Sequence, residues 1–365
     1  MDISHPFETF QRSAFRLEGL PQYIVEDEKT AYAQFLKTGT AEPFDTEWAN
    51  LVAKNISAGK KMERLRLFSE KLTDYERFEV PIYGGPKAGE VIRTAPRGKY
   101  AEDYTYDFWF FDDEWIAQVY YEPDGTFIKF DVRQATSEEK DMFAFWYAVF
   151  ETAQPLKQVP FVSNTPDNTH CLQAAYMSIA TYFDPDFSIP MDEWAQLTGY
   201  EEGKGTWANA GLVWFKEHGY EVKHIETFDY QAFMDRPKEY MMEFNGEEAG
   251  TWGYAHTNVP AEIERMKKLL ETDIVERREP TLDDVRHYLN DGYLVRVTVN
   301  CRKLDGRKGY AGHAIAVIGY DDEHVTFHDP GLPPIPNRQV SWAEFEAAWA
   351  DPNPNMKEFD AIRKK

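Results

Sequence analysis

One segment near the C-terminus limits the possible folds more than any other part of this chain. Residues 312–331 read GHAIAVIGYDDEHVTFHDPG, which predicts an apolar strand, a polar turn and a returning strand. With the turn centred near Asp321, the antiparallel register predicts that His313 lies directly opposite Asp329. Opposed residues point to the same face with Cβ atoms about 5 Å apart, so we expect the carboxylate to hold the imidazole.

A second segment, far upstream, supplies a cysteine that such a histidine can activate. Residues 167–183 read DNTHCLQAAYMSIATYF and predict a helix whose first turn holds Cys171. Asp167, Asn168 or Thr169 is the expected cap of this helix. Unpaired N–H groups and the macrodipole at a helix N-terminus stabilise a thiolate, and a neighbouring imidazolium stabilises it further.

Each of these residues also has a purely structural interpretation. Cys171 can be a small buried apolar residue, His313 a core histidine, and Asp329 a turn former before Pro-Gly. Their joint occurrence is better explained by a cysteine-hydrolase site. In that hypothesis Cys171 attacks an acyl carbon, His313 is the general base and acid, and Asp329 orients the ring. Cys301 follows a strand rather than opening a helix, so we interpret it as a core thiol.

Acyl transfer also requires hydrogen-bond donors for the developing oxyanion. The backbone N–H of Cys171 is one expected donor. The side-chain amide of Asn164 is our first candidate for the second donor, and Asn168 and Gln158 are weaker alternatives. A loop asparagine that caps its own turn is an equally good interpretation of Asn164.

Composition narrows the class of protein. A chain of 365 residues with 42% hydrophobic content predicts two globular domains, and a formal net charge of −23 argues against nucleic acid as a partner. Two cysteines make no disulfide framework, and the histidines show no metal-ligand spacing, so we expect no metal and no cofactor. The N-terminus has no signal-peptide pattern and no apolar run reaches membrane-spanning length, which predicts a cytoplasmic protein without a membrane partner.

The predicted organisation is a domain over residues 1–152 followed by a domain over 153–365, with a Pro-containing seam between them. The first part is predicted to be α+β, with these elements: helices 6–17, 47–56 and 137–150, strand 62–68, and a hairpin over 115–133. The second part is also predicted to be α+β, with a helical insertion over 184–292. The insertion is predicted to hold helices 191–197, 207–218, 261–271 and 283–290. Strand 293–300 and helix 342–349 are predicted to follow it. Residues 245–258 are predicted to form a loop, and either a loop over a cleft that prefers basic substrates or a plain connecting loop fits their composition.

The second part resembles a known family. Residues 158–171, 312–320, 328–331 and 341–349 are similar to the papain-like bacteriocin-processing (double-glycine leader) peptidases and their wider relatives. The resemblance covers the chain from about Leu156 onward. It implies a papain-like cysteine protease fold, a helix bearing cysteine packed on an antiparallel sheet, with Cys171, His313 and Asp329 as the catalytic residues in chain order.

Two positions depart from the family pattern. Asn164 stands where the family usually has glutamine, with a spacing about one residue longer, and Leu172 follows the cysteine where glycine is common. Family members that process peptides for export are typically fused to transporters, which this chain lacks. The first part resembles an uncharacterised actinobacterial domain, through residues 7–10, 74–79 and 107–113, and that resemblance implies no activity.

The leading prediction is therefore a papain-like cysteine peptidase that acts on a peptide or another acyl substrate, with an accessory domain at its N-terminus. An acyltransferase that uses the same thioester chemistry is one alternative. A catalytically inactive binding or sensor protein is another. The sequence leaves the natural substrate and the oligomeric state open.

Overall fold

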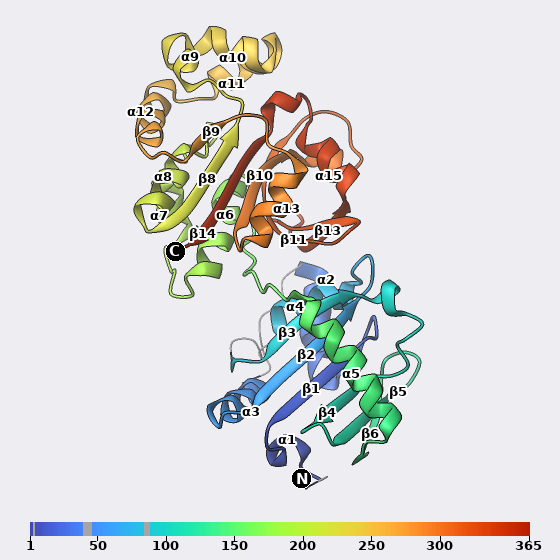
Figure 1. The fold of residues 1–365 in the computed structure, drawn as a ribbon. Helices are drawn as coiled ribbons and strands as arrows, with labels where there is room; N and C mark the ends of the chain where they lie inside the picture. The colour runs from blue at the N-terminus through green and yellow to red at the C-terminus, as the bar shows by residue number, and fades with distance from the viewer. Residues whose placement is uncertain (3, 39–45, 84–87) are drawn as a thin grey trace. The chain divides into compact units, whose positions relative to one another are not determined.

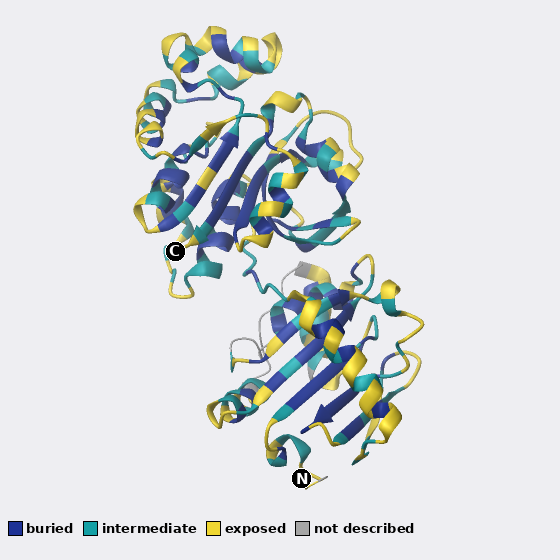
Figure 2. Cartoon of the chain, viewed as in Figure 1, coloured by how far each residue is buried: buried dark blue, intermediate teal, exposed yellow. Residues whose placement is uncertain are grey.

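The computed structural model describes residues 1–365 except 3, 39–45 and 84–87. The chain forms two compact units, Met1–Gln158 (unit 1) and Val159–Lys365 (unit 2) (Figure 1). Each unit is α+β, with buried strands and helices whose outer faces are exposed (Figure 2). Residues 153–158 belong to unit 1 because the short strand β7 (Gln154–Pro155) pairs with β3 (Val91–Pro96) in its sheet.

Unit 1 is built on a mixed sheet with the strand order β6-β5-β4-β1-β2-β3-β7 among the described residues. Its central strands β1 (Ser13–Glu18), β2 (Lys61–Phe68) and β3 run parallel. The strands β4 (Phe108–Phe111), β5 (Trp115–Tyr121) and β6 (Phe127–Gln134) form an antiparallel meander on the other side of β1. Parallel neighbours require crossover connections, which α2 (Lys29–Thr38), α3 (Thr46–Ser57) and α4 (Asp74–Ile82) provide.

Apolar side chains cover both faces of this sheet. The helix α5 (Ser137–Thr152) packs Trp146 and Phe150 on one face, and α3 packs Val52 on the other face. Two buried arginines lie within the central strand β2, and both are paired with carboxylates. Arg66 binds Glu79 at 2.8 Å, and Arg64 lies between Glu18 at 2.8 Å and Glu90 at 2.9 Å. Such pairing offsets the cost of burying these charges.

Unit 2 holds the sequence-predicted site. Its sheet has the order β13-β12-β11-β10-β14-β8-β9 among the described residues. The strands have these bounds: β8 Tyr220–Glu226, β9 Val275–Arg277, β10 Leu294–Asn300, β11 Gly312–Tyr320, β12 His324–Asp329, β13 Ile335–Ser341 and β14 Glu358–Lys364. All neighbours are antiparallel except β8 and β9.

Helices cover both faces of the second sheet (Figure 1). The helix α6 (Cys171–Phe183) lies against β11, β10 and β14, and α7 (Met191–Leu197), α8 (Asn209–Glu217) and α12 (Val259–Leu270) extend that layer. On the other face, α13 (Leu282–Asn290) and α15 (Trp342–Trp349) cover Val295, Ile315 and Val317. The helix α15 begins with a capping box, in which Ser341 and Glu344 bond reciprocally.

Three predictions about secondary structure are wrong. Residues 6–17 form only the short helix α1 (Pro6–Thr9), and β1 follows it. The prediction of one longer helix failed because a buried strand and a buried helix can both carry a continuous apolar run. The segment 184–292 is not purely helical, since it adds β8 and β9 to the sheet. Residues 245–258 are not a loop: α10 (Pro237–Asn245) and α11 (Glu247–Ala255) pack together there after α9 (Tyr230–Asp235).

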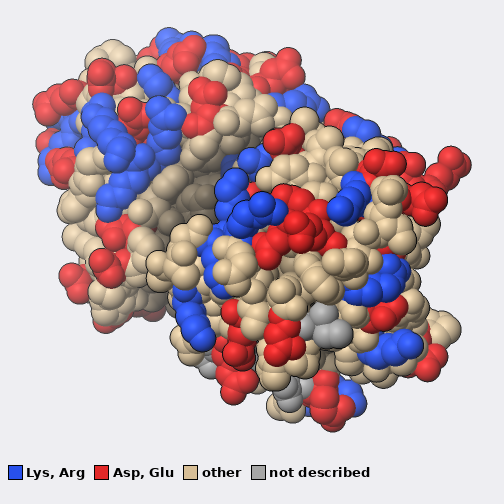
Figure 3. Space-filling model, turned by 60° about the horizontal axis from the view of Figure 1, so that its bottom comes forward, with Lys and Arg blue, Asp and Glu red and all other residues tan. Residues whose placement is uncertain are grey.

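The acidic excess is not segregated on the face drawn in Figure 3, where basic and acidic side chains are interspersed. Among the described residues, none of the helices combines the length and the hydropathy of a membrane span.

Candidate active site

Cys171 is the first residue of α6, and the chain enters this helix through a loop over residues 164–170. The cap is His170, whose side chain makes no capping bond, so the predicted cap at 167, 168 or 169 is wrong. The Asp167 carboxylate instead accepts from Thr165 and Thr169 within its own turn. The N–H groups in the first turn of α6 have no backbone acceptor within the helix, and that of Leu172 bonds to the Cys171 thiol instead.

The thiol of Cys171 is half-buried and hydrogen-bonds with the side chain of His313, the second residue of β11. Burial opposes a thiolate. The hydrogen bond and charge of His313, together with the N–H groups of Ala314 and Leu172, outweigh burial and lower the pKa of the Cys171 thiol below its ordinary value. The helix and the strand thus bring together two residues that lie far apart in the sequence.

Asp329, the last residue of β12, holds the other side of the imidazole. Its Oδ1 lies 2.7 Å from Nε2 of His313, which leaves Nδ1 as the ring nitrogen available to Cys171. Burial lowers the pKa of His313, but the bonds to Asp329 and Cys171 outweigh it and raise this pKa to about 10. Both shifts favour the imidazolium beside the thiolate over the neutral pair.

The expected contact of His313 with Asp329 is present, but the expected register is wrong. The strands pair Ala316 with His328, and an irregularity follows at Val317/Gly319. Continuing this ladder places Asp329 beside residue 315 rather than beside 313. A shift of two residues keeps both side chains on one face, so the carboxylate still reaches the ring.

Arg338 and Gly331 complete the surroundings of Asp329. Arg338 on β13 donates to Oδ2 of Asp329 at 2.7 Å and to Asp305 at 2.9 Å, and the N–H of Gly331 donates to Oδ1 of Asp329 at 3.0 Å. Burial raises the pKa of Asp329, and its bonds to His313, Arg338 and Gly331 outweigh burial and lower it. Sequence reasoning missed both residues, since an arginine on a strand and a glycine after proline have many ordinary explanations.

Asn164 is buried in the loop that precedes α6. Its Oδ1 accepts from the backbone of Thr165 at 2.9 Å and of His170 at 2.7 Å, and its Nδ2 donates to Asn168 at 2.9 Å. The backbone N–H of Asn164 donates to Pro330 at 2.8 Å, which ties this loop to the segment after Asp329. These bonds show a loop-forming role, and a role as oxyanion donor stays a prediction.

The weaker oxyanion alternatives are placed differently. Gln158 donates to the carbonyls of Val80 and Tyr83 within unit 1, at 2.8 and 2.7 Å. Asn168 is exposed in the approach to Cys171 and adopts a positive φ of 60°. Cys301 opens the short helix α14 (Cys301–Leu304), contrary to the prediction that it opens none.

A second buried polar cluster lies on the α6 side of the sheet. His224, Glu358 and Asp360 bring potential metal-ligand atoms within 4.8 Å of one another among the described residues. His224 Nδ1 lies 2.6 Å from Asp360, and Arg296 donates to Asp360 at 2.5 Å and to Glu358 at 2.8 Å. A guanidinium therefore already supplies the positive charge that a metal ion would bring.

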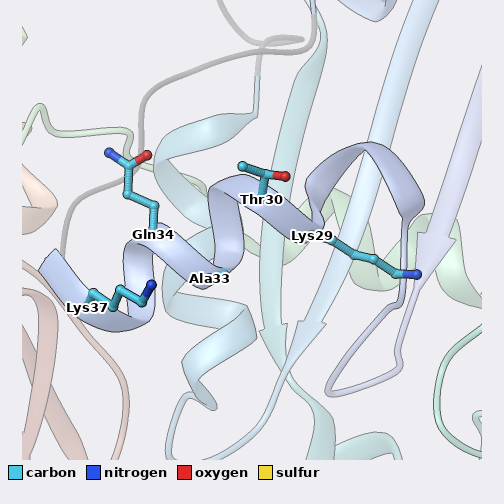
Figure 4. A pocket seen from close by; sticks show the side chains of 5 residues that line it. All are labelled: Lys29, Thr30, Ala33, Gln34 and Lys37. Carbon is cyan, nitrogen blue, oxygen red and sulfur yellow. The ribbon is translucent and has the colours of Figure 1, made fainter.

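A surface depression of about 500 Å³ lies on α2 in unit 1 and is not part of the thiol site. Its lining comes from one helix, and the labelled side chains point in different directions rather than toward a common ligand (Figure 4).

Comparison with known proteins separates the two units. A family model described as "Peptidase C39 like family" matches residues 156–353, which is more than half of the chain. The chain belongs to the peptidase C39-like family. A second family model, a domain of unknown function (DUF6879), matches residues 1–159. Among curated proteins none matches the chain.

Two solved structures are similar to the C39-like part. The peptidase domain of Streptococcus ComA, a bifunctional ABC transporter of a quorum-sensing pathway, is 13% identical with a TM-score of 0.31, covering 57% of this chain and 99% of that one. A candidate C39-like peptidase from Bacillus anthracis is 14% identical with a TM-score of 0.31, covering 57% of this chain and 97% of that one. This chain departs from the pattern of the family at Leu172, which follows Cys171, and at Asn164 in the preceding loop.

Proposed function

We propose that the protein is a cysteine peptidase in which Cys171 is the nucleophile, His313 the general base and acid, and Asp329 the residue that orients the imidazole. The observation that carries the proposal is the continuous contact from the thiol through the ring to the carboxylate. Family membership makes a peptide the first substrate class to test.

In the proposed reaction, the thiolate attacks an amide carbonyl and forms a new C–S bond. The imidazolium of His313 gives its proton to the leaving amine as the C–N bond breaks, which leaves a thioester on Cys171. His313, now neutral, takes a proton from a water molecule as the water oxygen attacks the thioester carbonyl. The C–S bond then breaks, the acid is released, and the thiolate beside the imidazolium is regenerated. The backbone N–H of Cys171 and the amide of Asn164 are the proposed donors to the oxyanion.

The test compares the two cysteines of the chain. An electrophilic peptide probe is expected to label wild type once, as seen by intact mass, and to label Cys301→Ala equally. Cys171→Ala is expected to remain unlabelled while it keeps the wild-type melting temperature. Labelling that persists in Cys171→Ala would refute the assignment. Partition of the acyl group between water and an added amine then distinguishes a peptidase from an acyltransferase.

An inactive binding protein is the second candidate, because the Asn164 amide is engaged within its own loop and Leu172 replaces the common glycine. This candidate predicts stoichiometric peptide binding without turnover, and an alkylation rate at Cys171 that follows an ordinary thiol pKa. Fast alkylation at neutral pH would exclude it.

A further inference from the structure

The strand β6 leaves one edge of the unit 1 sheet open. It is the outermost strand on its side of the described sheet and pairs with β5 along its inner edge (Figure 1). A single backbone bridge from Ile24 reaches Thr126, just before the strand begins. An outer strand presents a row of backbone N–H and C=O groups that another strand can bind.

This edge is unusually apolar. Phe127, Ile128 and Phe130 are 45%, 48% and 46% exposed, and the rings of Phe127 and Phe130 lie 5.0 Å apart. Edge strands that stay unpaired carry charges or proline that discourage pairing, and β6 also carries alternating charges. Its three exposed large apolar side chains are what indicate a surface that is covered in the working protein.

The sequence of β6 is complementary to itself in the antiparallel direction. Residues 127–133 read FIKFDVR. When two copies pair about Phe130, Lys129 of each copy faces Asp131 of the other, and the two Phe130 residues face each other. Directly opposed charges of opposite sign and opposed apolar residues both stabilise antiparallel pairs.

The charges of β6 favour this register over the neighbouring one. Among the described residues Lys129 has no carboxylate partner and lies 5.1 Å from the ring of Tyr120. A register centred on Val132 would instead use Arg133, but Glu139 already holds Arg133 through contacts of 2.6 and 2.7 Å. The contact of Asp131 with Arg133 is longer, 3.4 Å, and exposed, so Asp131 can change partner at little cost.

We propose that β6 is a homodimer interface, in which a second copy of the chain adds its own β6 antiparallel to the first and joins the two unit 1 sheets. The pairing of β5 with β6 shifts at Tyr120/Tyr121 and leaves Ile128 as an extra residue. This irregularity ends the regular ladder on one side. The shared ladder is therefore short, and the dimer is expected to be weak and concentration-dependent.

Sedimentation velocity of the full chain over a range of concentrations tests the proposal. Wild type is expected to shift from monomer to dimer as concentration rises. Lys129→Asp places two aspartates opposite each other at both symmetric contacts, and is expected to raise the dissociation constant about tenfold or more. The exchange Lys129→Asp with Asp131→Lys restores opposite charges and is expected to recover the wild-type value.

Melting temperature and circular dichroism establish that each variant is folded, and Lys140→Asp on the outer face of α5 is the matched charge control. A wild-type chain that stays monomeric at every concentration would overturn the proposal. So would a dimer that Lys129→Asp leaves unchanged, or a loss that the double exchange fails to recover. Phe130→Ser is a second variant that should weaken the dimer, because it removes the central apolar contact without altering the charge.

Discussion

At the scale of single residues, the proposed chemistry depends on how three side chains share two protons. The imidazole of His313 contacts Cys171 on one side and Asp329 on the other, and these contacts lower the pKa of the thiol and raise that of the imidazole to about 10. Arg338 partly neutralises the Asp329 carboxylate by donating a hydrogen bond to its second oxygen, Oδ2. The reactivity of the thiol therefore depends on residues that never touch it.

The pH dependence of alkylation is the first consequence. The thiolate and the imidazolium coexist from the lowered pKa of Cys171 up to about pH 10, where His313 loses its proton. We expect the alkylation rate of Cys171 by iodoacetamide to begin its fall at a lower pH than that of an ordinary thiol, which slows below about pH 8.5. In His313→Gln, only the N–H groups of Ala314 and Leu172 still oppose burial. The thiol pKa should therefore rise, and the rate at pH 7 should fall at least about tenfold. An unchanged profile in that variant would contradict the assignment.

Gly331 gives a steric test of the same contact. A Cβ at this position would lie 3.0 Å from Oδ1 of Asp329 and 3.4 Å from Nε2 of His313. Gly331→Ala should therefore push the ring out of line and slow acylation by about tenfold. Gly319→Ala in the same hairpin is the control, since nothing lies within 4 Å of its added methyl group. Equal rates in both variants would show that the orientation of His313 does not matter.

Arg338 is expected to act through Asp329. Arg338→Gln removes a cation beside the carboxylate, so the pKa of His313 should rise and the alkaline limb of the acylation profile should move to higher pH. Looser orientation of Asp329 should also reduce kcat/KM by about tenfold, the usual effect of losing a supporting contact. Arg307→Gln serves as the control because Arg307 contacts Asp305, the other partner of Arg338, but not Asp329. A profile that does not move would limit Arg338 to a structural role.

The sequence predicted Cys171, His313 and Asp329 because each occupies a recognisable local position: a helix start, a strand start and a strand end. The predicted contact between His313 and Asp329 is present despite an error of two residues in the predicted register. Side chains two residues apart on a strand point to the same face, so this error left both side chains on the same face. Arg338 could not be predicted, because its partner is fixed by the pairing of β12 with β13 and not by any pattern in its own strand.

At the scale of elements, the clearest failure of prediction concerns α10 and α11. Glycines in residues 245–258 indicated a loop, but Gly250 allows close packing of two helices. A Cβ on Gly250 would lie 2.3 Å from the carbonyl oxygen of Met241. A sequence pattern does not separate a glycine that breaks a helix from one that lets a second helix approach.

Gly250→Ala is accordingly expected to destabilise unit 2, although alanine is the better helix former. The clash is with backbone that cannot move freely, and we expect a loss of about 2 kcal/mol in the free energy of unfolding by urea. At Gly253 the added methyl group meets only the flexible end of the Met241 side chain, at 2.7 Å, so Gly253→Ala should have a smaller effect. The reverse order would mean that the two helices do not pack as described.

At the scale of the whole molecule, buried charge fixes how the elements of unit 2 assemble. His224 on β8 bonds to Asp360 on β14 at 2.6 Å, to Glu226 at 3.0 Å and to Tyr230 on α9 at 2.8 Å. Tyr176, on the helix that begins at Cys171, donates to the same Asp360 at 2.7 Å. The helix that presents the thiol is therefore joined through one carboxylate to the centre of the sheet.

This cluster should make the stability of unit 2 depend on pH. Burial opposes the charged ring of His224, but Glu226 and Asp360 outweigh it and raise its pKa from 6.5 to about 10. A group whose pKa is raised by folding stabilises the folded state fully below its unfolded pKa, and that contribution disappears as pH rises through the folded value. In His224→Gln the carboxylates lose their cation, so wild type should exceed the variant by about 3 kcal/mol at pH 6. The difference should shrink steadily between pH 6.5 and pH 10, while the exposed His287→Gln shows no such trend. A difference that stays constant over this range would mean that His224 is neutral in the folded protein, and that its bonds to Asp360 and Glu226 are ordinary hydrogen bonds rather than ion pairs.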